Sequence, residues 1–252
     1  MTALLKYEFR KTLMTKLFVL GITLVAETVF LVGNLLGNSS PNGEMTTSIG
    51  ILLLVLTALG GILMISVQSV VTLHRDMNTK QGYMLFMTPN SSYRILGAKM
   101  IENVLSVYGA GILFFLLGIV DVSILFARLG QLERLANYVS DLLRSLNFQI
   151  EFTAKGFLIF AFASLSSWIG TITIAFLSDI ISSALFNGRK FNGLLTFVLF
   201  IGINFLMGLI MQAIPKSLGP NTSLLISGIT ALVFSAVMYF LASVIMDRYL
   251  SV

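Results

Sequence analysis

The stretch Met45–Leu73, MTTSIGILLLVLTALGGILMISVQSVVTL, contains no Asp, Glu, Lys or Arg. It is longer than the roughly 20 residues that a helix needs to cross the hydrocarbon core of a bilayer. Backbone polar groups find no water in lipid, so a stretch of this kind must satisfy them internally and is expected to be helical. His74, the one histidine of the chain, follows it directly. The stretch therefore predicts a transmembrane helix.

The rest of the chain repeats this pattern. The first apolar run, about 17–36, is interrupted only by Glu27, and four later stretches are free of the four charged residue types: Asn103–Val120, Gly156–Ser178, Phe191–Pro215 and Ser217–Met246. Charged residues make up 11% of the chain, against about a quarter in a soluble domain. We predict one all-α polytopic membrane domain, 1–252, with six spans at about 17–37, 47–73, 100–126, 154–181, 194–213 and 222–246.

Basic residues predict the orientation of these spans. With a cytosolic N-terminus, the inner flanks carry 11 basic residues and the outer flanks carry 5. This bias follows the positive-inside rule and places both termini in the cytosol, with the inner basic residues contacting anionic lipid, not nucleic acid. The inner set is Lys6, Arg10, Lys11, Lys16, Arg75, Lys80, Arg94, Lys99, Arg189, Lys190 and Arg248, and the outer set is Arg128, Arg134, Arg144, Lys155 and Lys216.

Two amphipathic segments are expected to lie along the membrane. Residues 1–16 place Leu5, Phe9 and Leu13 at helical spacing, which predicts an interfacial helix, although a plain basic flank that fixes topology would look similar. Residues 128–152 repeat leucine at steps of three or four, which predicts an amphipathic outer linker helix. That linker would cap an exit route or simply rest on the lipid surface.

The cytosolic segment 74–99 carries the most specific signal. An apolar run of five residues, Tyr83, Met84, Leu85, Phe86 and Met87, lies within an otherwise polar loop. The following Thr88, Pro89, Asn90 and Ser91 predict a turn and the cap of the next helix. An exposed short apolar helix favours docking in a groove of a partner protein. The alternative is an interfacial loop that buries these side chains among lipid headgroups.

Three carboxyl groups lie within the predicted spans. Glu27 falls near the middle of the first span, Asp121 near the outer end of the third and Asp179 near the inner end of the fourth. Because a charge at the bilayer centre costs about 3 kcal/mol or more, such groups should face protein or water. They line a substrate path, or they make structural hydrogen bonds with neighbouring helices. Gly33 and Gly37 form a Gly-x-x-x-Gly pattern that permits close helix approach.

Three parts of the chain together resemble the type-2 ABC transporter permease family: the run Leu85–Ser91, Lys99 before the third span, and the opening Leu5–Lys11. Within that family the chain is most similar to permeases of bacterial peptide exporters, including those for phenol-soluble modulins. The resemblance implies a permease of the bacterial cytoplasmic membrane that exports amphipathic or antimicrobial-type peptides. It implies a second permease copy as homodimer partner and a separate ATPase subunit, which would bind ATP and Mg²⁺ and contact residues 83–92.

The residues themselves fit a transport subunit better than an enzyme. The chain lacks the Gly-x-x-x-x-Gly-Lys-Ser/Thr loop that cradles nucleotide phosphates. With no cysteine and one histidine, it cannot build a thiolate or multi-histidine metal centre, so we expect neither a metal nor a cofactor in this chain. Two alternatives remain open: an ion-coupled secondary transporter that uses Glu27, and a non-transporting membrane immunity or sensor subunit.

Overall fold

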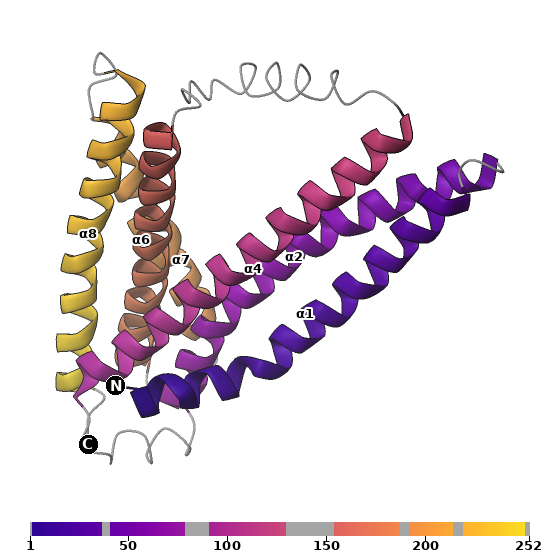
Figure 1. The fold of residues 1–252 in the computed structure, drawn as a ribbon. Helices are drawn as coiled ribbons and strands as arrows, with labels where there is room; N and C mark the ends of the chain where they lie inside the picture. The colour runs from indigo at the N-terminus through magenta and orange to yellow at the C-terminus, as the bar shows by residue number, and fades with distance from the viewer. Residues whose placement is uncertain are drawn as a thin grey trace. The chain divides into compact units, whose positions relative to one another are not determined.

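The computed structural model describes residues 2–36, 41–78, 91–129, 154–186, 192–213 and 219–249. These residues form six α-helices and, within these ranges, no strand (Figure 1). By length and composition, all six are long and apolar enough to cross a membrane. The chain is therefore an all-α polytopic membrane protein, as predicted. The helices are α1 (Thr2–Leu36), α2 (Pro41–Asn78), α4 (Ser92–Leu129), α6 (Ala154–Phe186), α7 (Asn192–Gln212) and α8 (Pro220–Tyr249).

The helices on either side of residues 79–90 are longer than the predicted spans. α2 continues past Leu73 to Asn78, and α4 begins at Ser92 instead of near residue 100. The backbone oxygen of Ser91 accepts hydrogen bonds from the amides of Arg94 and Ile95, at 2.9 and 3.2 Å. Ser91 thus takes the capping position predicted for it, and polar residues extend both helices beyond the apolar runs.

Residues 1–16 do not form a helix separate from the first span. α1 runs without a break from Thr2 to Leu36, so the helical character predicted for the N-terminal segment is confirmed from Thr2 onward. Its location at the membrane interface stays a prediction. The outer linker, apart from the last residues of α4, and residues Tyr83 to Asn90 lie outside the described residues.

The chain divides into two compact units. The first unit contains Met1–Glu8, Ser69–Val104 and Gln149–Val252, and the second contains Phe9–Gln68 and Leu105–Phe148. α1, α2 and α4 each contribute one part to each unit, whereas α6, α7 and α8 belong wholly to the first. The prediction of a single transmembrane domain stays a prediction.

The core of the first unit joins four helices. α6 packs along α8 and α7 (Figure 1). Its buried apolar side chains also meet the last turns of α2 and the first turns of α4. Burying this apolar cluster ties the two helix ends that flank residues 79–90 to α6 and α8. The cluster contains Leu73, Ile95, Leu96, Ile172, Phe176, Leu177, Ile180, Ala242 and Met246.

Close contact between the backbones of α1 and α2 organises the second unit. A Cβ atom added at Gly33 would lie 2.4 Å from the backbone nitrogen of Thr47. One added at Gly50 would lie 2.5 Å from the Cα atom of Phe30. Small residues at these two positions let the helix backbones approach, as they do in many membrane helix pairs. Gly33, the first glycine of the Gly-x-x-x-Gly pattern, therefore packs against α2 of its own chain.

We expect Gly50→Ala and Gly60→Ala to change stability in opposite directions. The methyl group at residue 50 must push α1 away, which should lower the free energy of unfolding by about 1–3 kcal/mol. A Cβ atom at Gly60 meets nothing within 4 Å, so alanine there should raise that free energy by up to about 1 kcal/mol through helix propensity. Thermal unfolding of the purified protein in detergent measures both, and shifts of the same sign would contradict this packing.

Candidate functional site

A buried ionic cluster joins three helix ends in the first unit. The Lys99 Nζ atom of α4 donates hydrogen bonds to Glu8 Oε1 of α1 at 2.9 Å and to Asp76 Oδ2 of α2 at 2.7 Å. Lys99 is 1% exposed, Glu8 2% and Asp76 5%. Glu8, Asp76 and Lys99, hereafter the ionic cluster, place one ammonium group between two carboxylates with almost no access to solvent.

Burying the ionic cluster destabilises the fold unless all three charged side chains are present. Taking each ion out of water costs several kcal/mol, and close opposite charges with good hydrogen-bond geometry recover this cost. Removing one member would leave the others buried without their countercharge, which typically destabilises a protein by about 3–5 kcal/mol. The positions of α1, α2 and α4 in the first unit are therefore constrained by one ammonium group.

A second polar contact attaches the end of α2 to α6. His74 Nδ1 lies 2.7 Å from Asp179 Oδ1, and Thr196 of α7 donates a hydrogen bond to the same oxygen at 3.4 Å. Asp179 is 1% exposed, so this contact is buried on the α6 side. Asp179 therefore contacts α2 and α7, and whether it lines a substrate path stays a prediction.

The start of α4 is attached to α8 in a similar way. The Ser92 hydroxyl donates to an Asp247 carboxylate oxygen. The Tyr239 hydroxyl donates to the backbone oxygen of Tyr93 at 2.5 Å, and the two tyrosine rings pack edge to face with centroids 6.4 Å apart. Both helices that flank residues 79–90 are thus held by polar contacts as well as by the apolar core.

The residues predicted to couple the chain to a partner are described only in part. Ser91 is exposed and precedes α4, whereas Tyr83, Met84, Leu85, Phe86 and Met87, with Thr88, Pro89 and Asn90, lie outside the described residues. Their contacts with a partner stay a prediction. What the structure adds is the anchoring of the helices on either side of them.

Lys99 requires a correction to the sequence analysis. We predicted that the inner basic residues, Lys99 among them, contact anionic lipid, but Lys99 is buried in the ionic cluster. Neither Glu8 nor Asp76 was recognised as its partner. Both acidic residues lie in basic flanks, and that local excess of positive charge made them look like ordinary surface residues. The one signal in the sequence was that Glu8, Asp76 and Lys99 all lie near helix ends predicted on the same side of the membrane.

The intramembrane carboxyl groups of the second unit form a pair. Glu27 of α1 and Asp121 of α4 lie within hydrogen-bonding reach of each other. Two ionised carboxylates can only accept hydrogen bonds, so a hydrogen bond between them requires that they share one proton. Glu27 and Asp121, hereafter the acid pair, thus make an interhelical contact of a kind that the sequence analysis did not anticipate, since it placed the two groups at different depths.

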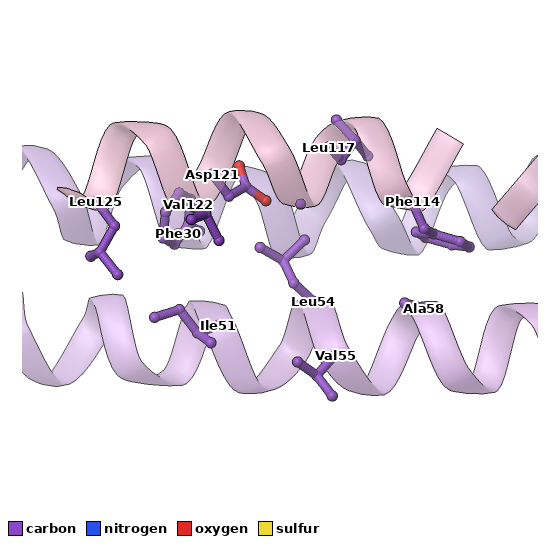
Figure 2. A pocket seen from close by; sticks show the side chains of 11 residues that line it. Phe30, Ile51, Leu54, Val55, Ala58, Phe114, Leu117, Asp121, Val122 and Leu125 are labelled. Carbon is purple, nitrogen blue, oxygen red and sulfur yellow. The ribbon is translucent and has the colours of Figure 1, made fainter. Parts of the chain in front are cut away.

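Asp121 of the acid pair lines an apolar cavity of about 280 Å³ between α1, α2 and α4 (Figure 2). Figure 2 shows Asp121 on α4 across from Leu54 and Ile51 on α2. Asp121 is the one polar side chain in the lining, and it is 9% exposed. The lining contains Phe30, Ile51, Leu54, Val55, Ala58, Phe114, Leu117, Gly118, Asp121, Val122 and Leu125.

Comparisons with known proteins assign no family or function to this chain. Searches against models of protein families, curated proteins and solved structures find no match for this chain. Within the described ranges, no three His, Cys, Asp or Glu side chains gather in a way that could hold a metal ion. The geometry of the ionic cluster and of the acid pair is therefore the main structural evidence on function.

Replacing Lys99 with methionine should destabilise the protein by about 3–5 kcal/mol, because Glu8 and Asp76 would lose their buried countercharge. The triple variant Lys99→Met, Glu8→Gln, Asp76→Asn should recover much of this loss, since no buried charge remains. Lys6→Met is the matched control, because Lys6 is exposed. Thermal unfolding in detergent measures each variant, and a Lys99→Met protein as stable as Lys6→Met would rule out the cost assigned to this cluster.

Proposed function

We infer that the chain is the membrane permease subunit of an ATP-driven exporter of amphipathic peptides in the bacterial cytoplasmic membrane. It would act as a homodimer with two separate ATPase subunits, which bind ATP and Mg²⁺. Both termini and residues 74–99 would lie in the cytosol. The observation that best supports this proposal is the ionic cluster, which links both helices flanking residues 79–90 to the N-terminal part of α1.

A segment that receives force from a partner must be attached firmly at both ends. α2 leads into residues 79–90 with Asp76 in its last turn, and α4 leaves them with Lys99 in its second turn. The direct Lys99–Asp76 contact makes these two helix ends move together, and the Lys99–Glu8 contact adds the start of α1. Displacement of residues 83–91 by an ATPase would therefore be transmitted to three helices at once.

Energy for such movement would come from outside this chain. The sequence has no Gly-x-x-x-x-Gly-Lys-Ser/Thr loop, so nucleotide hydrolysis is assigned to the partner. The apolar run from Tyr83 to Met87 would enter a groove on the ATPase, where apolar side chains supply affinity. Closure of two ATPase subunits on ATP would then draw the coupled helix ends together and open an outward path.

The first test is purification of the tagged full chain from its native membrane, with mass spectrometry of what co-elutes. We expect a stoichiometric ATPase, and we expect it to be lost from the Leu85→Asp, Phe86→Asp, Met87→Asp variant because the apolar contact is replaced by charge. The matched control is Asn78→Asp, Thr79→Asp, Gln81→Asp, which adds the same charge within residues 74–99 but keeps the apolar run.

Membrane insertion of both triple variants should match that of the unmodified chain. An ATPase that remains bound, with full ATPase activity, to the variant at residues 85–87 would overturn the coupling assignment. A chain that elutes alone under conditions that preserve other membrane complexes would overturn the proposal as a whole.

The acid pair favours one second candidate, an ion-coupled secondary transporter. Two carboxyl groups that share a proton inside a span could exchange it during transport. Under this alternative, the chain alone in liposomes would move substrate when a pH gradient is applied, and Glu27→Gln would abolish the movement without loss of folded protein. Transport that requires the ATPase and ATP would exclude it.

A further inference from the structure

We propose that the acid pair and the apolar cavity beside it bind a cationic amphiphile through a primary ammonium group, which replaces the proton that Glu27 and Asp121 share. The ligand's apolar part would occupy the cavity, and its ammonium group would lie between the two carboxylates.

Asp121 Oδ1 and Glu27 Oε2 are buried, and apart from the shared proton they accept no hydrogen bond from a donor group within the described part of the chain. Buried polar atoms are nearly always satisfied in folded proteins, and leaving one unsatisfied costs about 1–3 kcal/mol. An ammonium group carries three donors and no acceptor, so it can serve both oxygens at once.

The apolar lining of the cavity favours a ligand with an apolar part over a bare metal ion. A bare metal cation prefers six or more oxygen ligands when it is Ca²⁺, and near-ideal octahedral oxygen geometry when it is Mg²⁺. The lining offers the oxygens of Asp121 and otherwise apolar side chains, which cannot replace a hydration shell. The apolar part of an amphiphile fits such a wall, and about 280 Å³ is near the lower end of small-molecule pockets.

The exposed part of the cavity lining also favours a lipophilic ligand. Val55 and Val122 line the cavity and are 53% and 38% exposed, and Leu52 and Leu56 on the same helix as Val55 are exposed as well. These side chains belong to helices that span the membrane, so the approach runs past apolar surface. A small hydrophilic cation would lose its hydration on that path, whereas an amphiphile would not lose favourable contacts.

Exchange of a proton for an ammonium group leaves the charge of the site unchanged. The acid pair with one shared proton carries one negative charge. With both carboxylates ionised and one ammonium bound, the total is again one negative charge, and the displaced proton passes to water. A proton shared by the two carboxylates occupies the place that the ammonium group would take, so binding of the ammonium group displaces the proton. Among the described side chains of this unit, the other titratable groups are Arg10, Lys11, Lys16, Glu44 and Tyr108, and none lines the cavity.

This inference deepens the proposed function, because it names the chemical class that the exporter would carry, and it rests on that function only for the direction of movement. Binding itself requires neither an ATPase nor transport. A test on the purified full chain can therefore fail while the permease assignment stands, and the ATPase co-purification can fail while this binding site stands.

The experiment uses the full chain in phosphatidylcholine nanodiscs and a photoreactive long-chain primary alkylamine as probe, with labelled residues mapped by mass spectrometry. We expect labelling of cavity residues on α2 and α4, such as Leu54 and Leu117, and competition by unlabelled alkylamine but not by the alkanol of equal length. Glu27→Gln with Asp121→Asn should reduce labelling about tenfold or more, since a hydrogen-bonded charge is lost. Glu44→Gln, at an exposed acid on α2, should not reduce it.

Equal competition by amine and alkanol would overturn the proposal and identify the cavity as a plain lipid groove. Undiminished labelling of the double variant would overturn it too. A measurement on the unmodified chain guards against a double variant that fails to fold. Infrared difference spectroscopy should show a protonated carboxyl band that disappears when the alkylamine binds and persists with the alkanol. A band unaffected by the amine would contradict proton exchange.

Discussion

The demand of one buried ammonium group for two carboxylates is the constraint on which the first unit depends. The Lys99 ammonium group has its buried hydrogen bonds and countercharges only while Glu8 and Asp76 stay within hydrogen-bonding distance. That requirement fixes where the start of α1, the end of α2 and the start of α4 lie relative to one another. Apolar packing of Leu73 and Ile95 on α6 and α8 would tolerate small shifts, whereas the ion contacts tolerate much less.

The second unit handles buried charge differently. Glu27 and Asp121 meet with no basic side chain in the cavity lining, so a shared proton takes the role that Lys99 has in the ionic cluster. A lysine side chain is held by its backbone and cannot leave, but a proton can exchange with water or with a competing cation. The ionic cluster is therefore suited to a permanent structural link, and the acid pair is suited to a site whose occupancy changes.

The sequence allowed the helices to be predicted because an apolar run of membrane length has few alternatives. Met45–Leu73 lies within α2, and the Ser91 cap of α4 follows from local backbone chemistry. Pairings between distant residues could not be predicted in this way. Glu8 and Lys99 are 91 positions apart, and their contact depends on how whole helices pack. The acid pair was missed for the same reason: depth judged from each span separately placed Glu27 and Asp121 apart.

Two helices connect the two polar clusters. α1 carries Glu8 and Glu27, and α4 carries Lys99 and Asp121, so each helix contributes one member to the ionic cluster and one to the acid pair. Helices are stiff along their axes, because every turn is closed by backbone hydrogen bonds. This covalent continuity offers a physical route by which force applied beside the ionic cluster would change the affinity of the acid pair for its cation.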